Sequence, residues 1–232
     1  MNTTLSNPFL MICLTLGVFF MAKQLQKKTG LVLLNPLLLT MAFLIILLRV
    51  CGISYESYNE GGRYISFWLK PAVVALGVPL YLQLESIKKQ LLPIMLSQVA
   101  GCILGVVSVV VVARLFEATP EIIASLAPKS VTTPIAMEVS EATGGIPSLT
   151  ASVVVCTGVL GAVLGFQVMK LFGIRSLIAQ GLAIGTASHA LGTSAAVSYS
   201  RRLGSYASIG LTLNGVLTAI FTPHILGWFS LI

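Results

Sequence analysis

The sequence contains very little charge. Only 9% of its 232 residues are charged, whereas 56% are hydrophobic; a soluble domain carries about 25% charged residues. A soluble chain of this composition would have too few polar side chains to cover its core, but a lipid bilayer solvates an apolar outer face. The composition therefore excludes an ordinary soluble domain and predicts an integral membrane protein.

Aspartate is absent altogether, and all seven acidic residues are glutamates. The net charge of +7 comes from basic residues that stand singly or in short clusters between apolar runs. This pattern is typical of loops at a membrane surface and argues against a nucleic-acid partner. The sequence also has no HExxH motif, nucleophile elbow or phosphate loop, and no aspartate for a catalytic triad. We therefore expect no enzymatic activity and no cofactor.

The four cysteines lie far apart in the sequence, and no CxxC pair occurs. Three of them lie in apolar runs, where a thiol usually serves as a small hydrophobic side chain. They predict neither a disulfide framework nor a metal site. The first apolar run has no basic region before it and no A-x-A cleavage site, so we expect a retained helix rather than a signal peptide.

Eight apolar segments are long enough, or nearly long enough, to cross a membrane as helices, which needs about 20 residues. Because the loops between them are short, we expect one all-α membrane domain spanning residues 1–232, with no soluble appendage. The segments are roughly 7–22, 31–50, 64–84, 90–113, 120–142, 146–169, 176–199 and 206–230.

Basic residues between these segments predict the orientation, because they are enriched in cytoplasmic loops. Placing them inside puts both termini outside the cell. If all eight segments cross, Lys170 and Arg175 fall outside, against this rule. If 120–142 and 176–199 dip in and return, six segments cross and both residues move inside. The number of crossings is six to eight, and six fits the charges better. The residues that set the orientation are Lys23, Lys27, Lys28, Lys88, Lys89, Arg201 and Arg202.

An internal repeat of two units, about 64–116 and 120–172, is predicted from three short matches. Each unit is a proline-interrupted segment followed by a glycine-bearing helix. Repeated halves with interrupted segments in corresponding positions indicate the binding site of a transporter. The matches pair Pro79–Gln83 with Pro134–Glu138, Leu104–Val107 with Leu160–Val163, and Arg114–Phe116 with Lys170–Phe172.

The stretch P-K-S-V-T-T-P-I-A-M-E at 128–138 is the most informative part of the sequence. Pro128 and Pro134 lie six residues apart and break any helix through this stretch. Thr133 directly before Pro134 is a good N-cap followed by a favoured first helical position. We therefore expect a new helix to begin at Pro134.

The free N–H groups of that helix would point back at Ser130, Thr132 and Thr133. A bound anion would satisfy them, assisted by the positive end of the helix dipole and by Lys129. The alternative is a proline kink capped by its own threonines, with Lys129 extending to the membrane interface. The anion site is the hypothesis that we develop.

A second candidate stretch has two Gly-Thr pairs, at 185–186 and 192–193, on either side of His189. Small residues at this density permit close helix packing, but they also permit an unwound segment that faces a cavity. An ionisable group such as His189 within the membrane could relay a proton or donate to a carboxylate. The candidate residues here are Thr186, Ser188, His189 and Thr193.

Two further proline breaks add Pro79 and Asn35 as candidate binding residues. Pro79 ends the doubly broken stretch 71–79 and matches Pro134 in the repeat, and Asn35 precedes Pro36 in the second segment. Exposed backbone inside a bilayer is tolerated only beside protein or a watery cavity. We therefore expect the stretches at 128–138 and 185–196 to share one cavity.

Six motifs of this chain resemble those of the LrgB/CidB family of membrane proteins, over essentially the whole length. They are L-L-N-P-L-L at 33–38, C-G-I-S-Y-E-S-Y at 51–58, P-A-V-V-A-L-G-V-P-L-Y at 71–81, P-K-S-V-T-T-P-I-A-M-E at 128–138, G-G-I-P at 144–147 and G-L-A-I-G-T-A-S-H-A-L-G-T at 181–193. Family members commonly have an acidic residue shortly after the last motif. This chain has S-Y-S-R-R at 198–202 instead, which removes any acidic role there.

The resemblance implies two functions of different classes. One is transport of small monocarboxylates such as glycolate, glycerate, lactate or pyruvate across the bacterial cytoplasmic membrane. The other is a holin-like or antiholin-like modulator of murein hydrolase activity and autolysis. The resemblance also implies a small LrgA/CidA-type membrane partner, which bacterial relatives linked to pyruvate transport have, and we expect a homo-oligomer. Broken helices with polar clusters inside the membrane favour the carrier, because such groups are costly unless they bind something.

Overall fold

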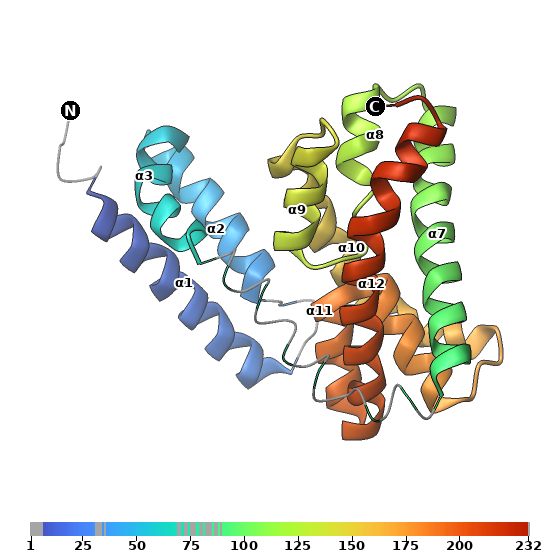
Figure 1. Cartoon of the computed structure of the whole chain (residues 1–232). Coiled ribbons are helices and arrows are strands. Elements are labelled where there is room, and N and C mark those ends of the chain that lie inside the picture. Colours follow the sequence, from blue (N-terminus) through green and yellow to red (C-terminus); the bar gives the residue numbers. More distant parts are fainter. Residues whose placement is uncertain are drawn as a thin grey trace. The chain divides into compact units, whose positions relative to one another are not determined.

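The structure is a computed structural model that describes residues 7–30, 34, 36–68, 71, 74, 78, 81, 85, 88 and 90–231. All regular structure in these residues is helical, which confirms the all-α prediction. The chain forms two compact units, 1–72 and 73–232, which we call unit 1 and unit 2 (Figure 1). Within the described residues, four helices are long and apolar enough to cross a membrane: α1 (Pro8–Thr29), α7 (Leu91–Leu115), α10 (Pro147–Leu171) and α12 (Arg201–Trp228).

Unit 1 contains α1, α2 (Pro36–Val50) and α3 (Tyr55–Ser66). Helix α1 starts where the Asn7 side chain accepts a hydrogen bond from the Phe9 N–H, and it ends at Gly30, whose φ of +68° suits glycine. Helix α2 begins at Pro36, at the break predicted from the sequence. Helix α3 was not predicted, because its sequence Y-E-S-Y-N-E-G-G-R-Y-I-S is too polar to resemble a membrane segment.

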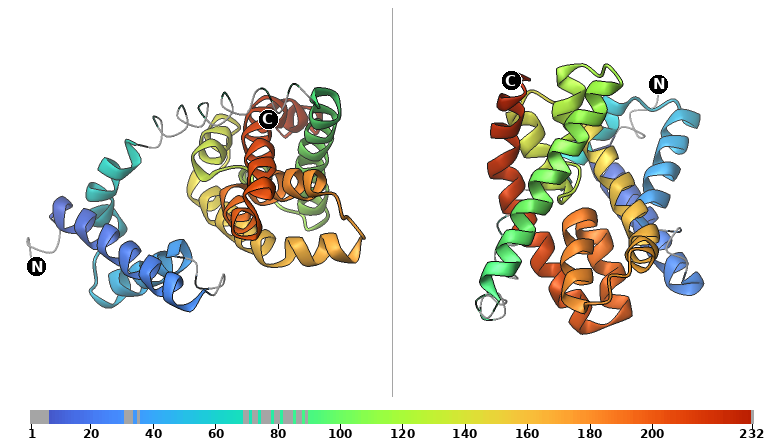
Figure 2. Two further views of the ribbon diagram at one scale, coloured as in Figure 1. Left: turned by 90° about the horizontal axis from the view of Figure 1, so that it is seen from below. Right: turned by 90° about the vertical axis from the view of Figure 1, so that its right-hand side faces the viewer.

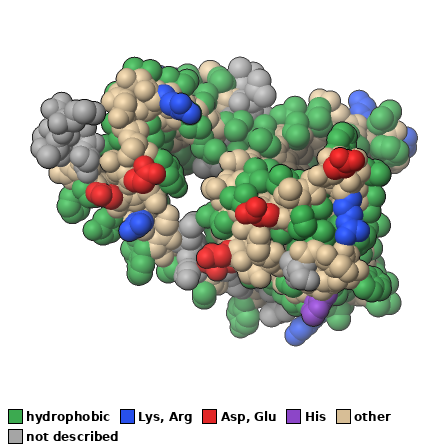
Figure 3. Space-filling model, turned by 90° about the horizontal axis from the view of Figure 1, so that it is seen from above, with side chains coloured by type: hydrophobic (Ala, Val, Ile, Leu, Met, Phe, Trp, Pro, Cys, Tyr) green, Lys and Arg blue, Asp and Glu red, His purple; other side chains and the backbone are tan. Residues whose placement is uncertain are grey.

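In unit 2 the spanning helix α12 is the central element. Of its most apolar 18-residue window, 61% is buried, against 28% for α7 and 22% for α10. The outer helices instead expose large apolar side chains such as Leu104 and Leu160, as expected for a surface that faces lipid. Figure 2 shows α12 running between the other helices of unit 2, and Figure 3 shows charged side chains standing singly among hydrophobic ones.

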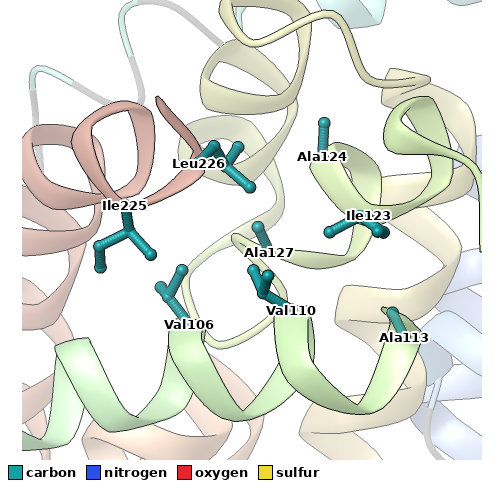
Figure 4. Close-up of a cluster of buried hydrophobic side chains, with 8 residues drawn as sticks. All are labelled: Val106, Val110, Ala113, Ile123, Ala124, Ala127, Ile225 and Leu226. Atoms are coloured by element: carbon teal, nitrogen blue, oxygen red, sulfur yellow. The ribbon is translucent and has the colours of Figure 1, made fainter. Parts of the chain in front are cut away.

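A buried hydrophobic cluster joins α7 and α12 to the short helix α8 (Pro120–Leu126) (Figure 4). It fixes α8 between two spanning helices and so positions the chain that follows α8. Its residues are Val106, Val110, Ala113, Ile123, Ala124, Ala127, Ile225 and Leu226.

Segment 120–142 enters unit 2 and returns to the same end. It forms α8 and α9 (Thr133–Ala142), separated by residues 127–132. After α9 the chain comes back to α8, because the Ile146 N–H donates to Ser125 Oγ at 2.7 Å and Thr150 Oγ1 donates to the Ser125 carbonyl at 2.9 Å. We call α8, residues 127–132 and α9 the α8–α9 hairpin.

Segment 176–199 also turns back, as helix α11 (Leu177–Tyr199) with a break at His189, where φ is +41° and ψ −136°. Gly185 before the break lies against Ala207 and Leu211 of α12, whereas Val197 after the break lies against Gly204 at the start of α12. Both ends of α11 therefore lie near the beginning of α12. We call this element the α11 hairpin.

The two hairpins enter unit 2 from opposite ends (Figure 2). Each has the geometry of the alternative in which 120–142 and 176–199 dip into the membrane and return. The number of crossings in the whole chain stays a prediction, because most of segment 64–84 lies outside the described residues. The predicted repeat of 64–116 with 120–172 is untested for the same reason.

Candidate functional site

A cavity of about 640 Å³ lies inside unit 2, between α7, residues 127–130, α11 and α12. We call it the central cavity. At one end it is lined by Gln90 and Ser176, which are exposed, and at the other by Asn214 and Thr218, which are 1% and 3% exposed. The cavity is therefore open at the end where α7 begins. Its wall is mostly apolar and includes the polar side chains of Gln98, Lys129, Ser130, Thr186, Asn214 and Thr218.

The turn of the α8–α9 hairpin brings Lys129 and Ser130 to the central cavity. The prolines at 128 and 134 prevent a continuous helix, so the chain leaves α8 and makes a tight turn in which the Val131 N–H lies 3.4 Å from the Pro128 carbonyl. Lys129 Nζ lies 3.0 Å from Ser130 Oγ. Among the described residues that line the cavity, Lys129 is the only charged one.

The first turn of α9 differs from the predicted one by a residue. The helix begins at Thr133, its N-cap is Thr132 and Pro134 is its second residue, so the prediction that Thr133 is the cap was wrong. Thr132 has the extended conformation of a cap, with φ −62° and ψ 144°, but its side chain accepts no bond from the helix. Thr132 Oγ1 is buried and has no hydrogen-bond partner in the part of the chain that the structure describes.

Asn214 on α12 connects the two hairpins. Its Nδ2 donates to the Ser130 carbonyl at 3.3 Å and to the Thr186 carbonyl at 3.0 Å. These two acceptors fix the orientation of the amide, because a flipped amide would put its oxygen against both carbonyls. One amide nitrogen can reach both carbonyls only if the turn of the α8–α9 hairpin lies beside the first arm of α11.

The side chain of Thr186 forms a second polar contact in the cavity lining, with Gln98. Thr186 Oγ1 lies 2.7 Å from Gln98 Oε1 on α7 and 2.7 Å from the Leu182 carbonyl one turn earlier in α11. Gln98 is 2% exposed, so its amide is withdrawn from solvent and oriented by this contact.

The break of the α11 hairpin, at His189, lies outside the lining of the central cavity and against α10. His189 Nε2 hydrogen-bonds to the Val154 carbonyl of α10 at 2.8 Å, and Thr193 Oγ1 donates to the His189 carbonyl at 2.8 Å. Glycines of α10 make room for this packing: a Cβ at Gly158 would lie 2.5 Å from the His189 ring, and one at Gly161 would overlap Ser188. These contacts anchor the hairpin to α10.

The structure thus divides the residues predicted from the sequence. Lys129, Ser130 and Thr186 line one cavity, whereas six others lie outside its lining. Pro79 and Asn35 are not among the described residues. The six that do not line the cavity are Thr132, Thr133, Pro134, Ser188, His189 and Thr193.

Three lining residues, Gln98, Asn214 and Thr218, were missed by reasoning from the sequence. Gln98 and Asn214 are single amides within long apolar stretches. Polar side chains within membrane helices usually face the bundle interior or a cavity, and this signal could have identified both. Thr218, whose Oγ1 lies 3.5 Å from Cys102 Sγ, could not have been distinguished from the many other threonines.

Chemically, the polar lining side chains named above, one cation, three hydroxyls and two amides, can hold a small polar or anionic molecule. Among the described residues, no three His, Cys, Asp or Glu side chains come together as a metal site. These features define a helical membrane protein in which two oppositely directed hairpins contribute to a mostly apolar cavity that contains a few polar groups.

The chain belongs to the LrgB-like family, whose model matches residues 15–228. It is 37% identical over 214 residues to the holin-like protein CidB of Staphylococcus epidermidis, covering 92% of this chain and 93% of the relative. It is 36% identical over 217 residues to the antiholin-like protein LrgB of Bacillus mycoides, covering 93% and 94%. An uncharacterized protein of Bacillus subtilis, YxaC, is 37% identical over 222 residues, 96% of each chain. No solved structure matches the chain.

Proposed function

We propose that this protein is a secondary transporter of small monocarboxylates, of the glycolate, glycerate, lactate or pyruvate type, in the bacterial cytoplasmic membrane. The observation that carries the proposal is the central cavity, which holds a single cation, Lys129, at the meeting point of two broken helices. Non-helical backbone at membrane depth and an ionisable side chain beside it are both expected where a transporter binds its substrate.

The charge of the lining favours a monoanion. Lys129 supplies one positive charge to the lining, and the N-terminus of α9, which lies outside the lining, adds at most about half a charge. A dicarboxylate would need a second cation, and the described residues of the lining include none. A carboxylate would lie beside Lys129 and the Ser130 hydroxyl, with the amides of Gln98 and Asn214 nearby.

The distribution of charge in unit 2 supports an orientation with the cavity open to the cytoplasm. Four basic residues lie at the open end, in the last turn of α10, the α10–α11 loop and the first turn of α12: Lys170, Arg175, Arg201 and Arg202. At the other end, Arg114 is accompanied by Glu117 and Glu121, and its guanidinium donates to the Phe229 carbonyl near the C-terminus. By the positive-inside rule the C-terminus is extracytoplasmic. A C-terminal phosphatase reporter should be active, and a fluorescent reporter dark; the reverse result would contradict this orientation.

Counterflow in proteoliposomes tests the transport function. Vesicles that contain the purified protein and unlabelled lactate should take up labelled lactate faster than protein-free vesicles, and the other short monocarboxylates should compete. Uptake of a labelled sugar of similar size is the control for leakage. If no short monocarboxylate exchanges while large solutes escape, the transport proposal fails and a pore is favoured.

The second candidate is a holin-like or antiholin-like modulator of autolysis. It is favoured by the names of two relatives, the holin-like CidB and the antiholin-like LrgB. A small LrgA/CidA-type partner and a homo-oligomer belong to this proposal as well as to the first. Expression in a host that lacks its own LrgB-type proteins separates the two. A modulator should change autolysis whether or not carboxylates are present, whereas a carrier should change it only through carboxylate flux.

A further inference from the structure

Lys129 has no counter-ion among the residues that the structure describes around it. Its ammonium group contacts Ser130 Oγ, and it is half-buried at the turn of the α8–α9 hairpin. The residues of α8, α11 and α12 that line the central cavity carry no titratable side chain, and those of α7 contribute only the buried thiol of Cys102. Neutral side chains alone therefore surround this amine.

A charge in such a place is unstable unless an anion accompanies it. Moving an ammonium group from water into a poorly solvated site without a partner is unfavourable, so such an amine tends to lose its proton instead. A bound carboxylate reverses this preference, because the two charges attract each other strongly where water is scarce. The proton on Lys129 and the carboxylate therefore stabilise each other at the site.

Lys129 also borders a second hollow, an apolar groove of about 500 Å³ at the outer side of α7. Besides Lys129, it is lined by residues of α7, by Phe116 after that helix, and by Ala118 and Leu126. The central cavity extends from Lys129 toward Gln90 and Ser176 instead. Lys129 is thus shared by the linings of two hollows.

We propose that Lys129 carries one proton together with each carboxylate, so that the protein is an electroneutral proton–monocarboxylate symporter. The inference rests on the proposed transport function. On release, one N–H bond of the ammonium breaks, its electron pair stays on Nζ, and the proton passes to water in the cavity as the carboxylate leaves. The empty site then returns without a net charge, and the amine takes up a proton from water on the other side when the next carboxylate binds.

His189 was the sequence-based candidate for a proton carrier, and its contacts do not favour that role. Its ring bonds to a backbone carbonyl of α10 and packs against Gly158. It lies outside the lining of both hollows that border Lys129. A proton on His189 would therefore have no direct contact with a carboxylate in the cavity.

The test is lactate transport in proteoliposomes by the full-length protein and by Lys129→Arg. Arginine keeps the positive charge but does not release its proton in proteins. For the wild type, net uptake should respond to an inside-alkaline pH gradient, with about tenfold accumulation per pH unit, and should not respond to a potassium diffusion potential. Protein-free vesicles give the background from lactic acid that crosses the lipid by itself.

Lys129→Arg should separate exchange from net uptake. Counterflow moves the loaded site in both directions and needs no deprotonation, so it should stay within about tenfold of the wild type, given the altered fork geometry of arginine. Net uptake driven by the pH gradient should fall to the background of protein-free vesicles. Lys170→Arg, at the open end and outside both linings, should behave as the wild type does.

The outcomes distinguish the two proposals. Absence of wild-type counterflow would overturn the transport function itself. Wild-type counterflow with net uptake driven by voltage or sodium, and not by the pH gradient, would overturn the proton inference alone. It would also be overturned if Lys129→Arg kept full uptake driven by the pH gradient. If Lys129→Arg does not insert, the response of the wild type to the two gradients still decides.

Discussion

The α8–α9 hairpin and the α11 hairpin both interrupt their helices inside unit 2, but the interruptions differ in length and surroundings. In the first, six residues, 127–132, separate the two helices, and Lys129 and Ser130 among them line the central cavity. In the second, a single residue, His189, leaves it, and its side chain bonds to α10. Only the longer interruption brings a charged side chain to the cavity.

The neighbouring helix accounts for the difference. Glycines at 158 and 161 let α10 approach the α11 hairpin closely, so little space remains for a ligand at that break. The turn of the α8–α9 hairpin is bonded to Asn214 and packs through Val131 against Val154 of α10, but its Lys129 and Ser130 still line the cavity. A break in a membrane helix forms a binding site where its neighbours leave room, and a structural joint where they do not.

The largest effect that would sharpen this comparison is expected for Lys129→Met. Methionine fills a similar volume without the charge, and loss of a charged partner in a poorly hydrated site should reduce lactate counterflow by about 100-fold. Protein level and insertion should stay normal. Lys170→Met is the matched control and should transport as the wild type does, because Lys170 lies outside the cavity. Normal counterflow by Lys129→Met would show that Lys129 does not bind the substrate.

The next effect is expected for Asn214→Leu, which removes the connection between the hairpins. The carbonyls of Ser130 and Thr186 would each lose a donor, at a cost of about 2 kcal/mol in the free energy of unfolding. Thermal unfolding in detergent measures it, and transport should fall together with stability. Thr222→Val is the control, because this buried hydroxyl of α12 has no partner among the described residues and its loss should not destabilise. Equal stability of both variants would contradict the connecting role of Asn214.

A smaller effect on stability is expected where α10 packs against the break of the α11 hairpin. Gly161→Ala adds a methyl group where Ser188 leaves no space, and overpacking of this kind costs about 1–3 kcal/mol. Gly227→Ala in α12 adds the same methyl group where no atom lies within 4 Å, and should stabilise by up to about 1 kcal/mol through helix propensity. Changes of the same sign in the two melting temperatures would contradict tight packing at Gly161.

The sequence predicted the breaks better than it predicted their surroundings. Proline spacing located the turn at 128–134, and loop charges favoured two segments that dip in and return, because both signals are local or additive. Which side of a break faces a neighbouring helix depends on packing between residues far apart in the chain. His189 and Thr186 looked equivalent in the sequence, yet only Thr186 reaches the cavity. Asn214 lies 84 residues from its partner Ser130, and no local pattern indicates that contact.

His189→Gln distinguishes a structural role of His189 at the break of α11 from the hypothesis, drawn from the sequence, that His189 carries a proton. The glutamine amide can still donate to the Val154 carbonyl, so the unfolding free energy should fall by less than about 1 kcal/mol. Because His189 lies outside the cavity lining, the pH dependence of lactate uptake should match that of the wild type. A shifted pH profile with unchanged stability would instead assign the proton to His189 and remove the distinction drawn between the two hairpins.

The smallest effects are expected at the first turn of α9, where Thr132→Val and Thr133→Val decide which threonine caps the helix. A capping hydroxyl is worth about 1 kcal/mol, but only if it accepts a bond from the helix. Thr132 occupies the N-cap position without such a bond, and its buried hydroxyl lacks a partner within the described ranges, so valine should leave stability unchanged or raise it slightly. Thr133 is the first helical residue, where a hydroxyl is not needed as a cap, so its replacement should change the unfolding free energy by less than about 0.5 kcal/mol. Thermal unfolding of the two variants side by side measures both. A loss of about 1 kcal/mol confined to Thr133→Val would restore the cap predicted from the sequence, and would mean that the N–H groups of α9 are already satisfied by the protein without an anion.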